Sequence, residues 1–333
     1  MPDHPRALEP IRFGPQILMT VLSRLAQGIG LVVIVGAIAF AIPRWARPNH
    51  YVGETGVGGV LHAMSRAFLH LDFGSACGWP GCPSVYSMWS RGWVDDVSML
   101  FGTVAIGVGG GFALGLWCAA RSGSRRARIV EGTATVLYCT PPYVLGFAVL
   151  LLFQREFGHW PLPYFFDAAP VWASPVSSPW DWLRTLLVPW LVAATPLAAM
   201  CLRLVVALLR EQEDADYVRT AIAKGVPYKR VIRRHAGPFA HAGAASLVGV
   251  SAPLVVTNLI LVERVFGVPG FFFHTYKATG HPRSFREPPV IDFEMLAAIA
   301  VWAAVFIVVL SYAMDLALWR IDPRLRTAQR TRA

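Results

Sequence analysis

The sequence predicts an all-α polytopic membrane protein with six transmembrane helices, and three observations support this fold class. The chain is 55% hydrophobic and only 15% charged, whereas an ordinary soluble domain carries about 25% charged residues. It contains six apolar stretches, each long enough to cross a bilayer, for which about 20 residues are needed. Its basic residues are concentrated in alternate connecting segments, as in multi-pass membrane proteins.

The six stretches follow one another along the whole chain. They are Ile17–Ile42, Val97–Ala119, Ile129–Phe153, Leu183–Val206, His241–Val262 and Met295–Trp319. They divide the chain into an N-terminus (1–16), a first span (17–42), an outer region (43–96), a core with the other five spans (97–320) and a tail (321–333). We expect one membrane domain, since no second soluble domain or internal repeat is evident.

The placement of Lys and Arg predicts the orientation of the spans. Of the 30 basic residues, 20 lie before the first span or at its start, between spans two and three, from the last turn of span four to the start of span five, or after span six. Short loops rich in Lys and Arg stay in the cytoplasm. We therefore expect both termini to be cytoplasmic, and the net charge of +10 to reflect topology rather than binding to nucleic acid.

The outer region contains two cysteines in the run Cys77-Gly-Trp-Pro-Gly-Cys82. If this loop faces an oxidising compartment, the pair could form a disulfide. Two unpaired thiols fit the sequence equally well. The second outer loop, 154–182, is rich in Pro and aromatic residues, which suits a folded loop at the membrane surface.

The spans carry few residues that suggest chemistry. Gly107, Gly111 and Gly115 are spaced for close helix packing, which we favour over lining of a substrate path. Asp95 and Asp96 are interpreted as a solvated helix start rather than a catalytic pair. The nine histidines are scattered, without metal-ligand spacing. We therefore predict no catalytic residue, no metal site and no enzymatic activity in this chain.

The segment between spans four and five is the most informative part of the sequence. Asp214–Lys224 favours a helix, because acids at its start and Lys224 at its end match the helix dipole. Gly225 suits the left-handed conformation that follows many helices, and Pro227 suits the first turn of the next. Ala221 and Ala223 would let another backbone come close. By shape alone, the hairpin could equally stabilise its own side of the membrane.

The residues of this segment are similar to the coupling loop of ABC importer permeases, in the version typical of the dipeptide/oligopeptide class. The positions that match, at fixed spacing, are Glu211, Asp216, Tyr217, Val218, Arg219, Thr220, Ala221, Ala223, Lys224, Gly225, Arg234, His235 and Ala236. The resemblance implies a type I ABC importer permease fold with cytoplasmic coupling helices. It further implies the first, "B"-type, membrane subunit, with segment 211–236 contacting an ATPase.

Two further runs resemble signatures of the same family. One, at the outer end of the fifth span, contains Glu263, Phe266, Pro269 and Gly270, and could form part of an outer gate. The other, at the C-terminus, contains Asp315, Asp322, Pro323 and Arg324. The chain departs from the family pattern at 43–48 and at Asp95-Asp96, on the outer side, where cargo arrives.

The resemblance also implies the partners and cargo. The chain lacks the Gly-x-x-x-x-Gly-Lys-Ser/Thr loop, so ATP and Mg would bind to two separate ATP-binding subunits, and this chain would hold no cofactor. A second, related permease would complete a heterodimer in the bacterial inner membrane, and an extracytoplasmic solute-binding protein would deliver di- or oligopeptides. Nickel, glutathione or sugar cargo is an alternative. An ion-coupled carrier is a further one, which we disfavour because no inverted repeat or broken helix is evident.

Overall fold

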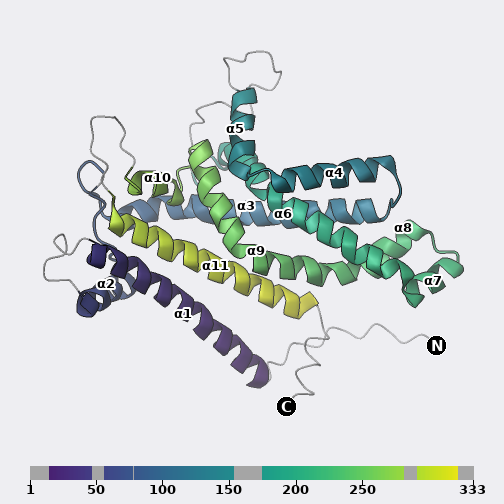
Figure 1. The fold of residues 1–333 in the computed structure, drawn as a ribbon, viewed down its shortest axis with the longest axis horizontal. Helices are drawn as coiled ribbons and strands as arrows, with labels where there is room; N and C mark the ends of the chain where they lie inside the picture. Colours follow the sequence, from purple (N-terminus) through teal and green to yellow (C-terminus); the bar gives the residue numbers. More distant parts are fainter. Residues whose placement is uncertain (1–14, 47–55, 78, 154–174, 281–290, 322–333) are drawn as a thin grey trace.

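The computed structural model describes residues 15–46, 56–77, 79–153, 175–280 and 291–321 (Figure 1). Helices make up nearly all of this part of the chain, and the only β-type pairing within it is an isolated bridge between Ser75 and Ser84. The predicted all-α class is confirmed.

The helices fall into long ones and short connecting ones. The long ones are α1 (Pro15–Ala46), α3 (Val85–Ala119), α6 (Pro179–Glu211), α9 (Gly237–Phe266) and α11 (Phe293–Ile321). The shorter ones are α2 (Gly56–His70), α4 (Arg125–Cys139), α5 (Pro142–Phe153), α7 (Asp216–Ala223), α8 (Tyr228–Val231) and α10 (Thr275–Ala278). The chain also has two 3-10 turns, η3 (Gln212–Asp214) and η5 (Phe272–His274), and one π-helical turn, η4 (Ile232–Ala236), among its described residues.

The five long helices are each apolar and long enough to cross a membrane. They contain five of the six predicted spans, and four of them extend only a few residues beyond the predicted ends. The exception is α3, which begins at Val85 rather than at Val97. Polar residues in its first turns, including Arg91, lower the mean hydropathy there, so hydropathy alone does not predict where the helix starts. The helix is nevertheless continuous from Val85.

The predicted continuous span Ile129–Phe153 is wrong. The structure has two helices, α4 and α5, which meet at an angle of 104°, so the chain has six spans only if this bent pair counts as one. The break falls at Thr140, whose backbone is extended (φ −89°, ψ 119°). A residue before proline is driven out of the helical region, and Pro142 has no N–H to continue the ladder. A broken span, which was not evident in the sequence, is therefore present.

Helices α3 and α6 pack together along most of their length through the three spaced glycines. A methyl group on Gly111 would overlap the carbonyl oxygen of Ala198 and lie 2.8 Å from Cβ of Cys201. On Gly107 and Gly115 it would likewise crowd residues of α6. The glycines therefore serve helix packing, as predicted.

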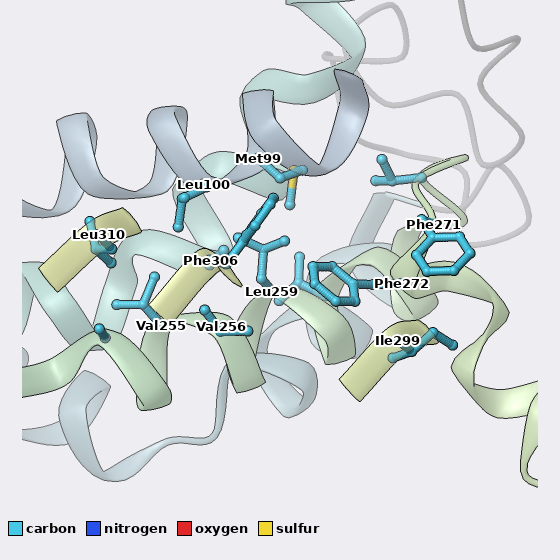
Figure 2. Packing of buried hydrophobic residues seen from close by; sticks show 14 of the residues in the cluster. Met99, Leu100, Val255, Val256, Leu259, Phe271, Phe272, Ile299, Phe306 and Leu310 are labelled. Atoms are coloured by element: carbon cyan, nitrogen blue, oxygen red, sulfur yellow. The ribbon is translucent and has the colours of Figure 1, made fainter. Parts of the chain in front are cut away.

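The main core lies where α3, α6, α9 and α11 meet the short segment after α9 (Figure 2). At its centre the rings of Phe272 and Phe306 meet edge to face, with centroids 5.5 Å apart. Met99 from α3 and Leu259 from α9 are buried in the same cluster. Helix α1 lies outside this core, against α11 and α2. Many of its apolar side chains are exposed, as expected of a surface that faces lipid.

Four of the short helices lie at opposite ends of the long ones (Figure 1). Helices α7 and α8 lie at the end where α3 finishes and α9 begins, whereas α2 and α10 lie at the other end. The first residue of α1 and the last of α11 lie at the ends of their helices away from α2 and α10. The short helices therefore mark two opposite ends of the molecule.

The glycine contact leads to a direct test. Replacing Gly111 with Ala should destabilise the protein by about 1–3 kcal/mol through overpacking. Gly110→Ala is the matched control, because a methyl group there meets nothing within 4 Å, and the better helix propensity should leave stability equal or raise it by up to about 1 kcal/mol. Thermal unfolding of the two purified variants in detergent measures the difference. Equal midpoints would contradict packing through Gly111.

Candidate functional site

The segment that follows α6 folds as the predicted helical hairpin. Helix α6 ends at Glu211, η3 turns the chain, and α7 starts at Asp216 with an acid in its first turn. Val218 is fully buried and attaches α7 to the rest of the protein. Most of the residues matched to the coupling loop are exposed, namely Glu211, Asp216, Tyr217, Arg219, Thr220, Ala223, Lys224, Gly225 and Arg234, whereas Ala221 is half-buried.

The turn after α7 depends on Gly225. Its φ of +79° is left-handed, and the N–H of Gly225 donates to the carbonyl of Ile222 at 2.9 Å. The N–H of Val226 donates to the carbonyl of Ala221 at 3.2 Å. These two bonds define a Schellman motif, in which glycine is favoured because it has no Cβ. The predicted C-cap is confirmed. Pro227 lies one position earlier than predicted, as the N-cap of α8.

Tyr228 closes the base of the hairpin. Its hydroxyl donates to Oε1 of Glu213 at 2.5 Å and lies 3.4 Å from Oγ of Ser122, in the loop between α3 and α4. Burial and the hydrogen bond to Glu213 raise the pKa of Tyr228, so the hydroxyl keeps its proton and acts as a donor. One side chain thus joins α8 to both neighbouring segments, a link that the sequence did not indicate.

The chain between α8 and α9 holds the hairpin against the ends of the long helices. Residues Ile232–Ala236 form a π-helical turn, a feature often found at functional sites. Ile232 and Ala236 are fully buried in one cluster with Ala119, at the end of α3, and Leu209, near the end of α6. The hairpin is therefore packed against the ends of three long helices, α3, α6 and α9. Of His235 only the backbone is described.

Ion pairs steady this end of the molecule. Arg210 of α6 donates from Nη2 to both oxygens of Glu131 of α4, at 2.7 and 3.0 Å. Arg219 of α7 donates to Oδ1 of Asp214 at 3.1 Å, but this pair is largely exposed. Exposed pairs contribute little to stability, so the charges of α7 remain available to a partner surface.

At the opposite end, the predicted gate residue Glu263 is fully buried. Phe266 and Gly267 end α9, with Gly267 in the left-handed region (φ 70°), while Pro269 is exposed and Gly270 buried. The side chain of Arg264 lies over the rings of Phe273 and Tyr276. Glu263 is therefore part of the core, whereas Arg264 is exposed and stacks on two rings, and a gate role for this run stays a prediction.

The interpretation of Asp95 and Asp96 as a solvated helix start is wrong. Both lie inside α3, and Asp96 is fully buried. Its Oδ1 accepts the N–H of Phe271 at 2.7 Å, and its Oδ2 accepts the indole N–H of Trp302 at 2.7 Å. Hydropathy cannot reveal such a residue, because its partners come from the far end of the sequence. The polar residues between Val85 and Asp96 leave no local sequence signal for this burial.

The remaining sequence candidates are partly described. Asp315 of α11 pairs with Arg24 of α1 at 3.8 Å, so this carboxylate connects the peripheral helix to the core. Asp322, Pro323 and Arg324 lie outside the described residues, as do most of the loop 154–182 and all but the inner ends of the predicted termini 1–16 and 321–333.

The structure has Cys77 and Cys82 as exposed free thiols rather than as a disulfide. A hydrogen bond to Cys82 and burial raise the pKa of Cys77 to about 11. Because the thiolate is the reactive form, such a thiol is slow to oxidise. Of the two alternatives that the sequence left open, the structure has the unpaired one.

Comparison with known proteins identifies the family. Residues 111–327 match the family of binding-protein-dependent transport system inner membrane components. This chain belongs to that family, and it is a multi-pass membrane permease component of such a transport system. The matched region includes the hairpin, α9 and α11.

Two curated relatives match over more of the chain than this region, and a third matches over less of it at higher identity. A probable peptide ABC transporter permease of Sinorhizobium fredii is 24% identical over 92% of this chain and 98% of its own length. The dipeptide transport system permease protein DppB of Bacillus subtilis is 23% identical over 78% of this chain and 77% of its own length. A putative peptide permease of Brucella ovis is 36% identical over 44% of this chain.

The anchoring role of Tyr228 can be tested by proteolysis. Tyr228→Phe removes a hydrogen bond worth about 1 kcal/mol, which should increase local opening, and hence trypsin cleavage in the hairpin, by roughly fivefold. Tyr217→Phe is the matched control, since Tyr217 lies in the more exposed α7 and the one bond shown for its hydroxyl among the described residues goes to Gln212 of the adjoining η3. Mass spectrometry of the early fragments measures cleavage after Lys224 and Lys229. Wild-type rates in both variants would refute the anchoring role.

Proposed function

We propose that this chain is the permease subunit of an ATP-driven importer that moves di- or oligopeptides across the bacterial inner membrane. The observation that carries the proposal is the hairpin of α7 and α8, which is exposed on one side and packed against the ends of α3, α6 and α9 on the other. The names of the relatives support peptide cargo.

The mechanism follows from this attachment. Separate ATP-binding subunits would hold ATP and Mg, because this sequence has no phosphate-binding loop. One of them would receive the exposed face of α7, where Gly225 keeps the surface open and charged residues surround the turn. Closure of the ATPase dimer on ATP would displace the hairpin. Since Ile232 and Ala236 are packed against Ala119 and Leu209, this displacement would move the spans together and change which side of the membrane the pathway faces. This chain would itself bind no cofactor.

The remaining partners are those that such a transport system requires. A second, related permease would complete the pathway, and two ATP-binding subunits and an extracytoplasmic solute-binding protein would act at opposite ends. Both termini and the hairpin would be cytoplasmic. The basic residues at this end support that orientation, for Arg121, Arg125, Arg126 and Arg128 are exposed in the loop beside Tyr228 and the start of α4.

Two alternatives to a peptide importer remain. One is the same type of importer with nickel, glutathione or sugar as cargo, and the other is an ion-coupled carrier that works alone. The broken α4–α5 pair removes one of the two arguments against an ion-coupled carrier, since such carriers use broken helices. The exposed hairpin favours the ATP-driven class, because a carrier that works alone has no need of a docking element.

Coupling through the hairpin can be tested with a matched pair of glycines. Gly225→Asp should abolish uptake of a labelled dipeptide and peptide-stimulated ATP hydrolysis in the reconstituted complex, while the protein still reaches the membrane. Gly123→Asp is the control. It has the same left-handed strain (φ 84° against 79°) and the same open surroundings, but it lies in the α3–α4 loop. The Gly123→Asp variant should retain uptake of the dipeptide. Normal transport by Gly225→Asp would disprove coupling, and uptake of labelled nickel, glutathione or sugar instead of dipeptide would disprove peptide cargo.

The proposed orientation has a simple test. A reporter enzyme that is active only outside the cytoplasm, fused after Arg326, should give no signal, because positively charged flanks are retained inside. The same reporter inserted between Gly58 and Gly59, at the opposite end of the molecule, should be active. Activity of the first fusion would overturn a cytoplasmic C-terminus.

A further inference from the structure

Two carboxyl groups meet in the core at the end of the molecule away from the hairpin. Asp96 comes from α3 and Glu263 from α9, and both are fully buried. An ideal Cβ on Gly270 would overlap Oδ1 of Asp96 and lie 2.5 Å from Oε2 of Glu263. Since both oxygens lie so close to a single point, they also lie close to each other. Only glycine at position 270 leaves space for the pair.

Within the described part of the chain, no positive charge is shown that compensates this pair. The charged groups that act on Glu263 are themselves carboxyls, those of Asp96 and Asp95. Cations on adjacent elements are engaged elsewhere, with Arg264 over Phe273 and Tyr276 and Lys277 over Trp79. His274 also contacts the ring of Trp79. Neither Asp96 nor Glu263 takes part in an ion pair shown for the described residues. Two buried carboxylates this close cannot both remain ionised.

The donors around the pair distinguish its two members. Asp96 accepts two N–H bonds of 2.7 Å, from Phe271 and Trp302, and such bonds stabilise the ionised form. Both oxygens of Glu263 are buried without a well-formed hydrogen bond, and among the described residues only the backbone N–H of Phe273 acts on this carboxyl as a donor. A buried carboxylate with so few donors is costly, whereas a protonated Glu263 can donate its own O–H to Asp96.

We propose that Asp96 and Glu263 form a proton-binding site that holds one proton at neutral pH, carried by Glu263 and donated in a hydrogen bond to Asp96. The site joins four parts of the chain, which are α3, α9, α11 through Trp302, and the segment after α9 through Phe271. Gly92 of α3 helps to make it, because any Cβ there would overlap the backbone of Gly270 and Phe271. The bound proton therefore fixes the outer loop to three spans.

The proposal predicts opposite results for two isosteric amides. Glu263→Gln stays neutral and keeps a donor toward Asp96, so its thermal midpoint should lie within about 2 °C of wild type. Asp96→Asn replaces one acceptor by an NH2 group, so one N–H, of Phe271 or of Trp302, loses its acceptor. A buried unsatisfied donor should lower the midpoint by about 3–10 °C. A drop in Glu263→Gln as large as that in Asp96→Asn would overturn the proposal.

An infrared measurement detects the proton itself. The purified full-length chain, with any partner subunits that it needs, should show at neutral pH the C=O stretch of a protonated carboxylic acid, which shifts in D2O. The band should disappear in Glu263→Gln. A wild-type protein without this band, or a band that survives in Glu263→Gln, would disprove the assignment. This comparison holds even if Asp96→Asn does not fold, and it is independent of transport activity.

Discussion

The close contact of α3 with α6 is the constraint on which the rest of the structure depends. In a membrane, helices gain no hydrophobic energy by meeting each other, so association depends on packing at short range. Here the glycines of α3 bring its backbone against α6, with Gly111 next to the carbonyl of Ala198. Two of the other long helices, α9 and α11, pack on this pair, and their shared core contains Phe272 and Phe306.

The two ends of this assembly are built differently. At one end the links are an aromatic hydroxyl and a buried aliphatic cluster, through Tyr228 and Ile232, and the hairpin itself is exposed. At the other end the links are charged or polar groups buried in the core, through Asp96 and Trp302. An exposed hairpin on a firm base suits an element that receives force from a partner. A buried polar network suits an element that must keep one arrangement until water or a partner reaches it.

Much of the candidate site was predictable because its signals are local. A helix, a left-handed glycine and a basic second helix follow from a dozen consecutive residues, and the Schellman bonds around Gly225 confirm that part. The anchor through Tyr228 was not predictable, since Ser122 is far away in the sequence. Asp96 was misjudged for the same reason. Its position beside Asp95 is typical of an exposed helix start, and only the distant Phe271 and Trp302 reverse that interpretation.

The sequence by itself determined the helical class, the approximate spans and the hairpin, because hydropathy, basic loops and cap residues act within a few turns of the chain. It also contained the prolines that break α4 from α5, although an apolar average over the stretch concealed the bend of 104°. Only the tertiary structure decided which polar residues are buried and what they contact. The burial of a polar residue depends on which helices become neighbours. Their packing brings Asp96 and Glu263, which are far apart in the sequence, beside the same glycine, Gly270.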